Sequence, residues 1–149
     1  MSKGLVLLHE RFLNAEHQCA LAIVKVQQDL QLFLEQQNAL NQYRQIYHQQ
    51  WTQQGLQGLS AEKNIQYHAF INKLERAIEQ QSEGLLQIRQ ALAQRKREWS
   101  LAQQRRKAVE ILLDKKVARE QLNALRQEQK MLDEYVMIRC HHQHNGDLY

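Results

Sequence analysis

The stretch of chain from residue 61 to about residue 138 contains no proline and a single glycine, Gly84. Good helix formers (Gln, Glu, Arg, Lys, Leu and Ala) fill most of it, so summed helix propensity predicts one continuous helix. Such a helix would span roughly 115 Å, whereas the average helix of a globular protein has about 11–12 residues. A helix of this length does not fit into a compact domain, so the rest of the chain must supply an elongated partner.

Apolar residues recur along this stretch at alternating intervals of three and four, with Gln81, Arg95 and Arg106 as interruptions. The apolar members of the repeat are Tyr67, Ile71, Leu74, Ile78, Leu85, Ile88, Leu92, Trp99, Ala102, Val109 and Leu113. This spacing is typical of the narrow seam of a coiled coil. The phase slips at residues 114–118, which indicates a stutter. Beyond it, with Gln129 keeping the interval, the repeat resumes as Leu122, Leu125, Leu132 and Val136.

The first part of the chain carries a similar repeat, which predicts a helix over about residues 5–52. We expect Asp29 and Gln36 to share its seam with Leu5, Leu8, Phe12, Ala15, Cys19, Ala22, Val26, Phe33, Leu40, Tyr43 and Tyr47. Residues 53–60 break the pattern, because Gly55 and Gly58 release the backbone and Ser60 is a good N-cap. A connection this short makes the two helices antiparallel neighbours. The predicted fold is all-α, a single coiled-coil hairpin over residues 1–149.

The two predicted helices differ in length. The first covers the second only to about residue 110, so residues 112–138 form an overhang without a partner in the chain. Isolated amphipathic helices depend on packing for their stability, so we expect the overhang to dock onto another molecule. Residues 140–149 include Asn145-Gly146 and show no periodicity, which predicts a disordered tail.

The net charge is +4, and the basic residues concentrate in three clusters at 95–97, 105–107 and 115–116. These clusters are either the solvated face of a coiled coil or a contact for an acidic partner or nucleic acid. No nucleic-acid-reading motif accompanies them, and no aromatic residues are interleaved as stacking platforms. We therefore expect no nucleic-acid partner.

The sequence lacks the motifs of phosphate-binding loops, dinucleotide sites and zinc sites, and a two-helix rod has no concave pocket for catalysis. We expect neither enzymatic activity nor a cofactor. His141, His142 and His144 lack a fourth ligand, so no metal site is predicted. Cys19 and Cys140 lie too far apart for a disulfide. No apolar run approaches the roughly 18–20 residues that cross a bilayer, which favours a cytoplasmic protein.

Three segments together resemble the FliJ family of flagellar type III export proteins. They are residues 40–47 (LNQYRQIY), residues 65–80 (IQYHAFINKLERAIEQ) and residues 129–135 (QKMLDEY). The resemblance covers nearly the whole chain. It implies a long antiparallel two-helix coiled coil similar to the gamma-subunit stalk of rotary ATPases.

The resemblance also implies partners. FliJ proteins bind the hexameric export ATPase FliI through the end where the termini lie, contact the cytoplasmic region of the export-gate protein FlhA nearer the hairpin tip, and interact with export chaperones. Any association with the membrane at the flagellar base is then peripheral and occurs through these partners. The implied activity is to stimulate the ATPase ring and couple it to the gate.

Carried over residue by residue, the family's export-gate patch falls on Gln36, Leu40, Tyr43, Tyr47, Phe70, Leu74, Ala77 and Gln81. Some relatives carry histidine at the position of Gln81. All eight also fit the alternative of ordinary seam residues. We expect the ATPase contact to involve Gln129, Met131, Leu132, Asp133 and Tyr135.

Two alternatives share the architecture. One is the equivalent stalk of an injectisome, against which the segment at residues 129–135 favours the flagellar branch. The other is a purely structural coiled-coil oligomer, in which Gln36, Arg95 and Arg106 set the register. The two classes differ in solution, because an oligomer forms higher-order bundles whereas a stalk is a monomeric hairpin.

Overall fold

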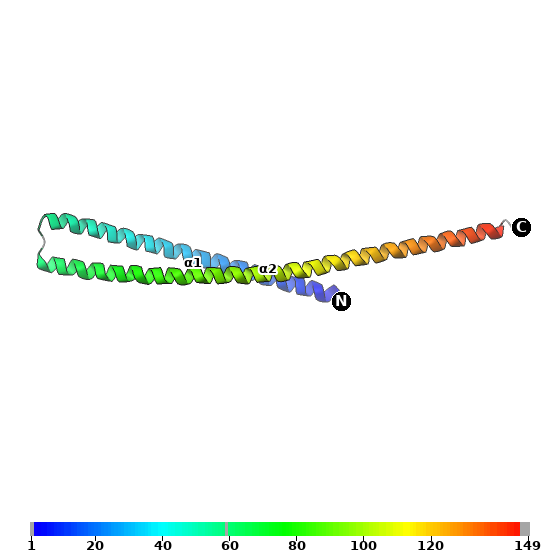
Figure 1. The fold of residues 1–149 in the computed structure, drawn as a ribbon, viewed down its shortest axis with the longest axis horizontal. Coiled ribbons are helices and arrows are strands. Elements are labelled where there is room, and N and C mark those ends of the chain that lie inside the picture. The colour runs from blue at the N-terminus through cyan, green and yellow to red at the C-terminus, as the bar shows by residue number, and fades with distance from the viewer. Residues whose placement is uncertain (1, 59, 147–149) are drawn as a thin grey trace. The chain divides into compact units, whose positions relative to one another are not determined.

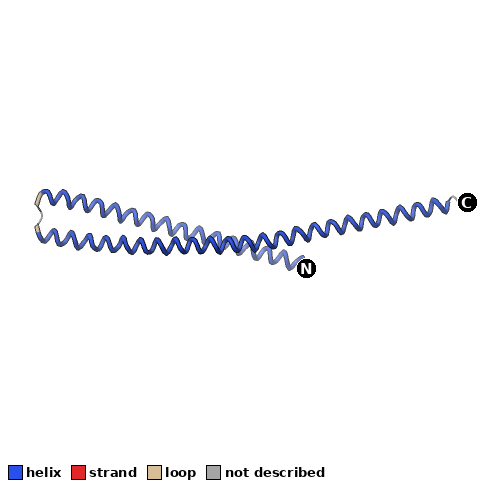
Figure 2. Tube along the Cα trace, in the orientation of Figure 1, coloured by secondary structure: helices blue, strands red, loops and turns tan. Residues whose placement is uncertain are grey.

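The computed structural model describes residues 2–58 and 60–146 of the chain. It contains two α-helices, α1 (Ser2–Leu56) and α2 (Ala61–Gly146). The helices pack against each other as a hairpin, as Figures 1 and 2 show. The predicted all-α hairpin is therefore confirmed, although both helices are longer than the sequence analysis expected.

The chain divides into two compact units, each built from parts of both helices. The hairpin unit comprises residues 14–102, and the terminal unit comprises residues 1–13 and 103–149. The described part of the terminal unit is residues 2–13 and 103–146.

The connection between the helices is shorter than the predicted loop at residues 53–60. Helix α1 runs through Gly55 and ends at Leu56, and Gly58 has a φ of 86°, a conformation that suits glycine. The Ser60 hydroxyl accepts a hydrogen bond from the Lys63 backbone N–H at 3.2 Å. Ser60 is thus the expected N-cap, which satisfies one of the free N–H groups at the start of α2.

The seam of the hairpin unit contains the predicted α2 residues. Tyr67, Leu74, Leu85 and Ala102 are buried, each at 7–8% exposure. Ile71, Ile78, Gln81, Ile88, Leu92 and Trp99 are half-buried, whereas Arg95 is exposed. The heptad assignment of α2 is therefore correct in this unit.

Eight of the thirteen seam positions predicted for α1 are half-buried as expected. Seven of them are Leu5, Phe12, Cys19, Val26, Phe33, Leu40 and Tyr47. Among the positions that alternate with these, the prediction was wrong for five, because Leu8, Ala15, Asp29, Gln36 and Tyr43 are exposed. For four of these five the residue one position further along is half-buried instead, namely His9, Glu16, Leu30 and Gln37, whereas Arg44, which follows Tyr43, is exposed. Ala22 is half-buried together with its neighbour Ile23.

The error has a physical cause. A heptad repeat allows a second seam position either three or four residues after each strong one. Leu8 and Ala15 were assigned to the seam, in preference to His9 and Glu16, because they are apolar. In the structure, the partner helix decides which of the two positions lies in the seam. A polar side chain at the seam edge can form a hydrogen bond to the other helix, as His9 does with Glu110.

Gly84 lies directly against a side chain of α1 in the hairpin unit. A Cβ atom added there would lie 2.7 Å from Cε1 of Phe33. Nearby, the Gln37 side-chain amide donates to the Ser82 hydroxyl at 3.3 Å. The absence of a side chain at Gly84 therefore makes room for the Phe33 ring at the seam.

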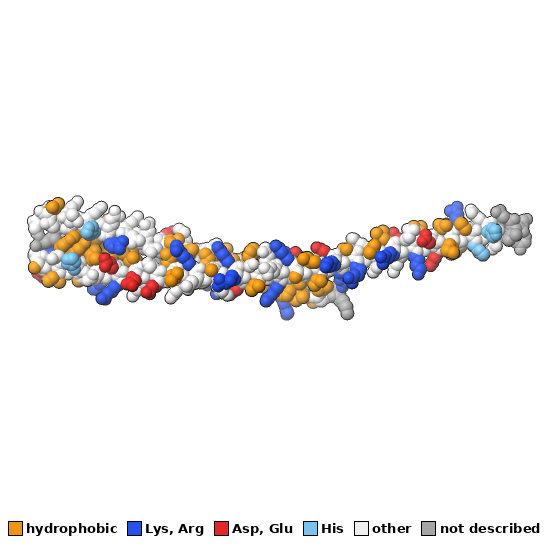
Figure 3. All heavy atoms as spheres, in the orientation of Figure 1, with side chains coloured by type: hydrophobic (Ala, Val, Ile, Leu, Met, Phe, Trp, Pro, Cys, Tyr) orange, Lys and Arg blue, Asp and Glu red, His pale blue; other side chains and the backbone are white. Residues whose placement is uncertain are grey.

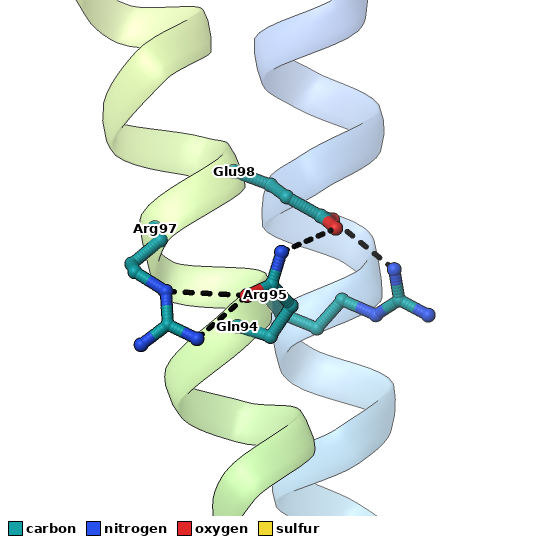
Figure 4. A network of polar contacts seen from close by, with 4 residues as sticks. All are labelled: Gln94, Arg95, Arg97 and Glu98. Atoms are coloured by element: carbon teal, nitrogen blue, oxygen red, sulfur yellow. Dashed lines mark hydrogen bonds and ion pairs between the residues drawn. The ribbon is translucent and has the colours of Figure 1, made fainter.

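Arg95 interrupts the α2 seam without being buried. Its guanidinium donates to the Glu98 carboxylate at 3.1 Å, and Figure 4 shows the side chain reaching across the neighbouring α1 ribbon. Gln94 donates to Glu98 at 3.4 Å and accepts two hydrogen bonds from Arg97. These contacts lower the pKa of Glu98, chiefly through the Arg95 hydrogen bond. The seam thus accommodates a charge by directing it to solvent.

In the terminal unit, the start of α1 is tied to α2 by a polar contact. The His9 ring donates from Nε2 to the Glu110 carboxylate at 3.0 Å, and Arg106 donates to the same oxygen at 2.8 Å. Val109, which is 4% exposed, lies in the α2 seam beside them. These hydrogen bonds lower the pKa of Glu110, with the bond from His9 as the largest cause.

From residue 117 to residue 146 every residue of α2 is exposed. We call this segment the overhang; it shares residues 117–138 with the overhang predicted at residues 112–138. The predicted disorder of residues 140–149 is wrong up to Gly146, where α2 ends. No proline or glycine intervenes between residues 85 and 145, and Asn145 and His141 form a 3.4 Å side-chain contact one turn apart. Residues 147–149 lie outside the described part of the chain.

Candidate interaction surfaces

An aromatic cluster occupies the tip end of the hairpin unit. Trp51 stacks on Tyr67 with ring centroids 4.0 Å apart and planes inclined by 9°. Tyr47 stacks on Tyr67 at 5.5 Å and contacts Phe70 at 4.3 Å. Figure 3 shows the hydrophobic side chains gathered at this end of the hairpin. Because these rings come from both helices, they join the helices close to the tip, where the seam would otherwise fray.

Tyr67 is the centre of this cluster. Its ring is buried at 8% exposure, and its hydroxyl is hydrogen-bonded to His48 Nδ1 at 3.1 Å. Burial raises the pKa of Tyr67, with smaller contributions from Tyr47 and Glu75. The hydroxyl therefore stays neutral and hydrogen-bonded, which is how a buried tyrosine is normally satisfied.

Part of the predicted export-gate patch forms a shallow groove beside this cluster. Gln36, Leu40, Tyr43 and Gln81 line it together with Ala39, and its volume is about 480 Å³. The Gln81 amide donates to the Gln36 side chain at 3.0 Å and to the Phe33 carbonyl at 3.3 Å. These bonds hold the amide of Gln81 at the groove wall, where it bridges α1 and α2.

The remaining predicted patch residues differ in exposure. Tyr43 is 54% exposed and its ring lies 5.9 Å from that of Phe70. Tyr47, Phe70 and Ala77 are half-buried, whereas Leu74 is buried at 7% exposure. Leu74 therefore belongs to the seam, and Tyr43 is the apolar patch residue most available to a partner.

Two residues of these surfaces, Ala39 and Trp51, were not predicted from the sequence. Ala39 precedes Leu40, and only the orientation of α1 shows that it lines the groove. Trp51 lies four residues after Tyr47, so the four-residue spacing of Tyr43, Tyr47 and Trp51 along one helix face was an available signal. A second groove, of about 520 Å³, is lined by both polar and apolar residues, among them Arg44, Glu75 and Ile71.

The five residues expected to contact the ATPase are all exposed on the overhang. By helical spacing they fall into two rows. Gln129 and Leu132 lie in a row with Leu122, Leu125 and Val136, whereas Met131 and Tyr135 lie in a second row with Ile138. Asp133 borders the first row, where the Gln129 amide approaches it at 3.5 Å. The overhang thus offers two apolar rows with polar borders.

Within the described part of the chain, no group of three or more His, Cys, Asp or Glu side chains is placed to hold a metal ion. Cys19 and Cys140 are both free thiols. Neither helix, over its described residues, has a segment long and apolar enough to cross a membrane. The groove lined by Gln36, Ala39, Leu40, Tyr43 and Gln81 is called the tip groove below.

A family model described as "Flagellar FliJ protein" matches residues 2–145. The chain belongs to the FliJ family. No curated protein matches it, and no solved structure does. Family membership makes this chain a non-enzymatic component of the flagellar export apparatus. The matched range includes the tip groove and all but the last residue of the overhang, so both surfaces belong to the part of the chain that the family model covers.

Proposed function

We propose that this FliJ-family chain is the central stalk of the flagellar export ATPase, which stimulates the FliI ring and couples it to the export gate. The observation that carries the proposal is the overhang. Its apolar side chains are 48–72% exposed at Leu122, Leu125, Met131, Leu132, Tyr135, Val136, Met137 and Ile138. A helix with this much unburied apolar surface is stabilised by a partner outside the chain.

The two apolar rows support a partner that surrounds the helix. A flat surface would contact one row and leave the other in water. A ring opening surrounds the helix and can contact both rows at once. Each contact would resemble an amphipathic helix that lies in a hydrophobic groove. The ATPase contact then includes Gln129, Met131, Leu132, Asp133 and Tyr135, with the two apolar rows facing different parts of the opening.

The tip groove is the proposed contact for the cytoplasmic region of FlhA. Tyr43 supplies an exposed aromatic ring, the kind of side chain that dominates binding energy at protein interfaces. The rest of the proposed contact consists of Gln36, Leu40, Tyr47, Phe70, Ala77 and Gln81. Leu74, which is buried in the seam, supports this surface from beneath. Export chaperones are further partners. The stalk would act at the cytoplasmic face of the membrane at the flagellar base, held there by these partners.

The test is ATP hydrolysis by the cognate export ATPase with and without this protein. We expect stimulation by the full-length chain and loss of stimulation on deletion of residues 120–149. The matched control is Tyr43→Ala, which alters the tip groove and should stimulate the ATPase normally. Full stimulation by the truncated chain would show that the overhang does not contact the ATPase.

A further inference from the structure

The first apolar row of the overhang continues the geometry of a coiled-coil seam. Leu122, Leu125, Gln129, Leu132 and Val136 follow intervals of three and four. Their apolar members are exposed by 48%, 62%, 59% and 55% in chain order. No residue of α1 in the described chain is paired with this segment by a hydrogen bond or an ion pair. The row therefore has the spacing of a helix that packs against one other helix.

The charges beside this row are self-complementary. Arg126 directly follows Leu125 and Asp133 directly follows Leu132, so both lie on the same edge of the row. Glu128 and Tyr135 precede Gln129 and Val136 and lie on the opposite edge. In an antiparallel pair of identical helices, like edges meet. Arg126 of each copy then lies beside Asp133 of the other, twice in the pair by two-fold symmetry.

The parallel arrangement is disfavoured by the same charges. In a parallel pair in register, opposite edges meet, and Glu128 of each copy would lie beside Asp133 of the other. Two repulsions would replace two attractions, and Gln129 would face itself in the seam. In the antiparallel pair Gln129 faces Leu132, and Leu125 packs on Val136. Charge complementarity therefore favours a second copy of this chain as the partner of the row, and it favours the antiparallel orientation of the two helices.

We propose that two copies of this chain pair through residues 117–142 as an antiparallel coiled coil when no larger partner occupies the overhang. The pair buries the row that contains Gln129 and Leu132. If the proposed function is also correct, the second copy and the ATPase compete for the overhang, so self-pairing would regulate stalk assembly. The pairing itself does not depend on the proposed function.

Sedimentation velocity of the purified full-length protein, without the ATPase, tests the pairing over a wide range of concentrations. We expect a monomer–dimer equilibrium. Arg126→Asp places two carboxylates together at both symmetric positions and should weaken dimerisation by roughly tenfold. Asp133→Arg should do the same through two guanidinium groups. The double variant Arg126→Asp/Asp133→Arg restores opposite charges and should restore the dimer.

The matched control is Lys130→Asp, which makes the same charge change on the face away from the row and should leave dimerisation unchanged. Circular dichroism of each variant checks that helicity is retained. A protein that stays monomeric at every concentration would overturn the proposal, as would assemblies larger than a dimer or a double variant that fails to recover.

Thiol cross-linking tests the direction of the pair. In a Cys19→Ser background, the antiparallel pair separates the two Cys140 side chains by roughly 30 Å along the helix axis. Adding Arg119→Cys places a second thiol beside Cys140 of the other copy. A short thiol-specific linker should therefore join the copies only in the variant with Arg119→Cys. Efficient joining in the Cys19→Ser background alone would establish a parallel pair and contradict the proposal.

These measurements contain no ATPase, so their failure leaves the stalk function standing. Conversely, loss of the stalk function in the hydrolysis assay would not affect the sedimentation result. Competition is measured separately, by whether the isolated ATPase dissociates the dimer.

Discussion

The ring of Phe33 lies against Gly84 so closely that a Cβ atom at Gly84 would be 2.7 Å from Phe33 Cε1. Real Cβ atoms do not approach other atoms this closely, so a larger residue at position 84 must displace the ring. The contact joins α1 and α2 in the middle of the hairpin unit.

Gly84→Ala should therefore destabilise the protein, although alanine is the better helix former. The helix gains about 1 kcal/mol in propensity, whereas overpacking costs about 1–3 kcal/mol. We expect a net loss of about 1 kcal/mol in urea unfolding followed by circular dichroism. Gly4→Ala is the control, because a Cβ atom added at Gly4 would have nothing within 4 Å. This substitution should not destabilise the protein. Phe33→Leu combined with Gly84→Ala should recover part of the loss; no recovery would mean that the ring is not the obstacle.

The Tyr67 hydroxyl should stabilise the tip through His48. We expect Tyr67→Phe to cost about 1 kcal/mol, the usual net worth of one hydrogen bond. Tyr67→Ala also removes the ring stacked between Trp51 and Tyr47 and should cost about 3–5 kcal/mol. Urea unfolding measures both. A double-mutant cycle with His48→Ala separates the hydrogen bond from the ring, and a coupling energy of zero would show that the bond contributes nothing.

The Glu110 carboxylate should make the terminal unit sensitive to acid. Its pKa lies below the ordinary value of 4.5 in the folded protein, so folding favours the ionised form. This contribution is present above pH 4.5 and is lost as the pH falls through the lower, folded pKa. Protonation removes the negative charge that strengthens the hydrogen bonds from His9 and Arg106, and the start of α1 should then loosen.

Thermal unfolding between pH 6 and pH 3 measures this effect. Relative to Glu110→Gln, the unaltered protein should lose stability more steeply below pH 4.5. The control Glu128→Gln, on the exposed overhang, should keep the steep dependence. The assignment would be wrong if Glu110→Gln and the unaltered protein lost stability in parallel.

Tyr43 should contribute binding energy at the tip groove without contributing much to folding. Because its side chain is 54% exposed, Tyr43→Ala should cost less than about 1 kcal/mol in stability. We expect it to weaken binding to the cytoplasmic region of FlhA by at least roughly tenfold, as loss of an aromatic hot-spot residue does. Isothermal titration calorimetry measures the affinity.

Two comparisons sharpen this test. Ile46→Ala removes an equally exposed apolar side chain (53%) outside the groove and should leave the affinity unchanged. Leu74→Ala removes a buried seam residue and should cost about 2–5 kcal/mol in stability, so a change in its binding would be ambiguous. Equal effects of Tyr43→Ala and Ile46→Ala would indicate a nonspecific surface contact.

The sequence predicted the α2 seam well because its strongest members leave little choice. Tyr67, Leu74 and Leu85 are large, apolar and spaced at heptad intervals, and all three are buried. The seam of α1 is less apolar, because polar residues share it. Leu8 was assigned to the seam because it is apolar, but it is exposed and His9 lies in the seam. His9 is held there by Glu110, which is 101 positions away in the chain, so the local sequence does not reveal the contact.

The surfaces show the same division. Resemblance and spacing indicated Tyr43, Phe70 and Leu74 as one patch, but only packing distinguishes an exposed ring at Tyr43 from the buried side chain of Leu74. The end of α2 was misjudged because a lack of apolar periodicity was interpreted as disorder. Polar residues such as His141 still continue a helix when no proline or glycine stops it.

The sequence by itself determined the fold class, the antiparallel pairing and the exposed overhang, because propensity, heptad spacing and helix length are local properties. The tertiary structure decided which polar residues share the seam, which patch residues remain accessible and why position 84 is glycine. Each of these depends on atoms brought together from distant parts of the chain, as Gly84 and Phe33 are, and their contact distances are not encoded in either segment alone.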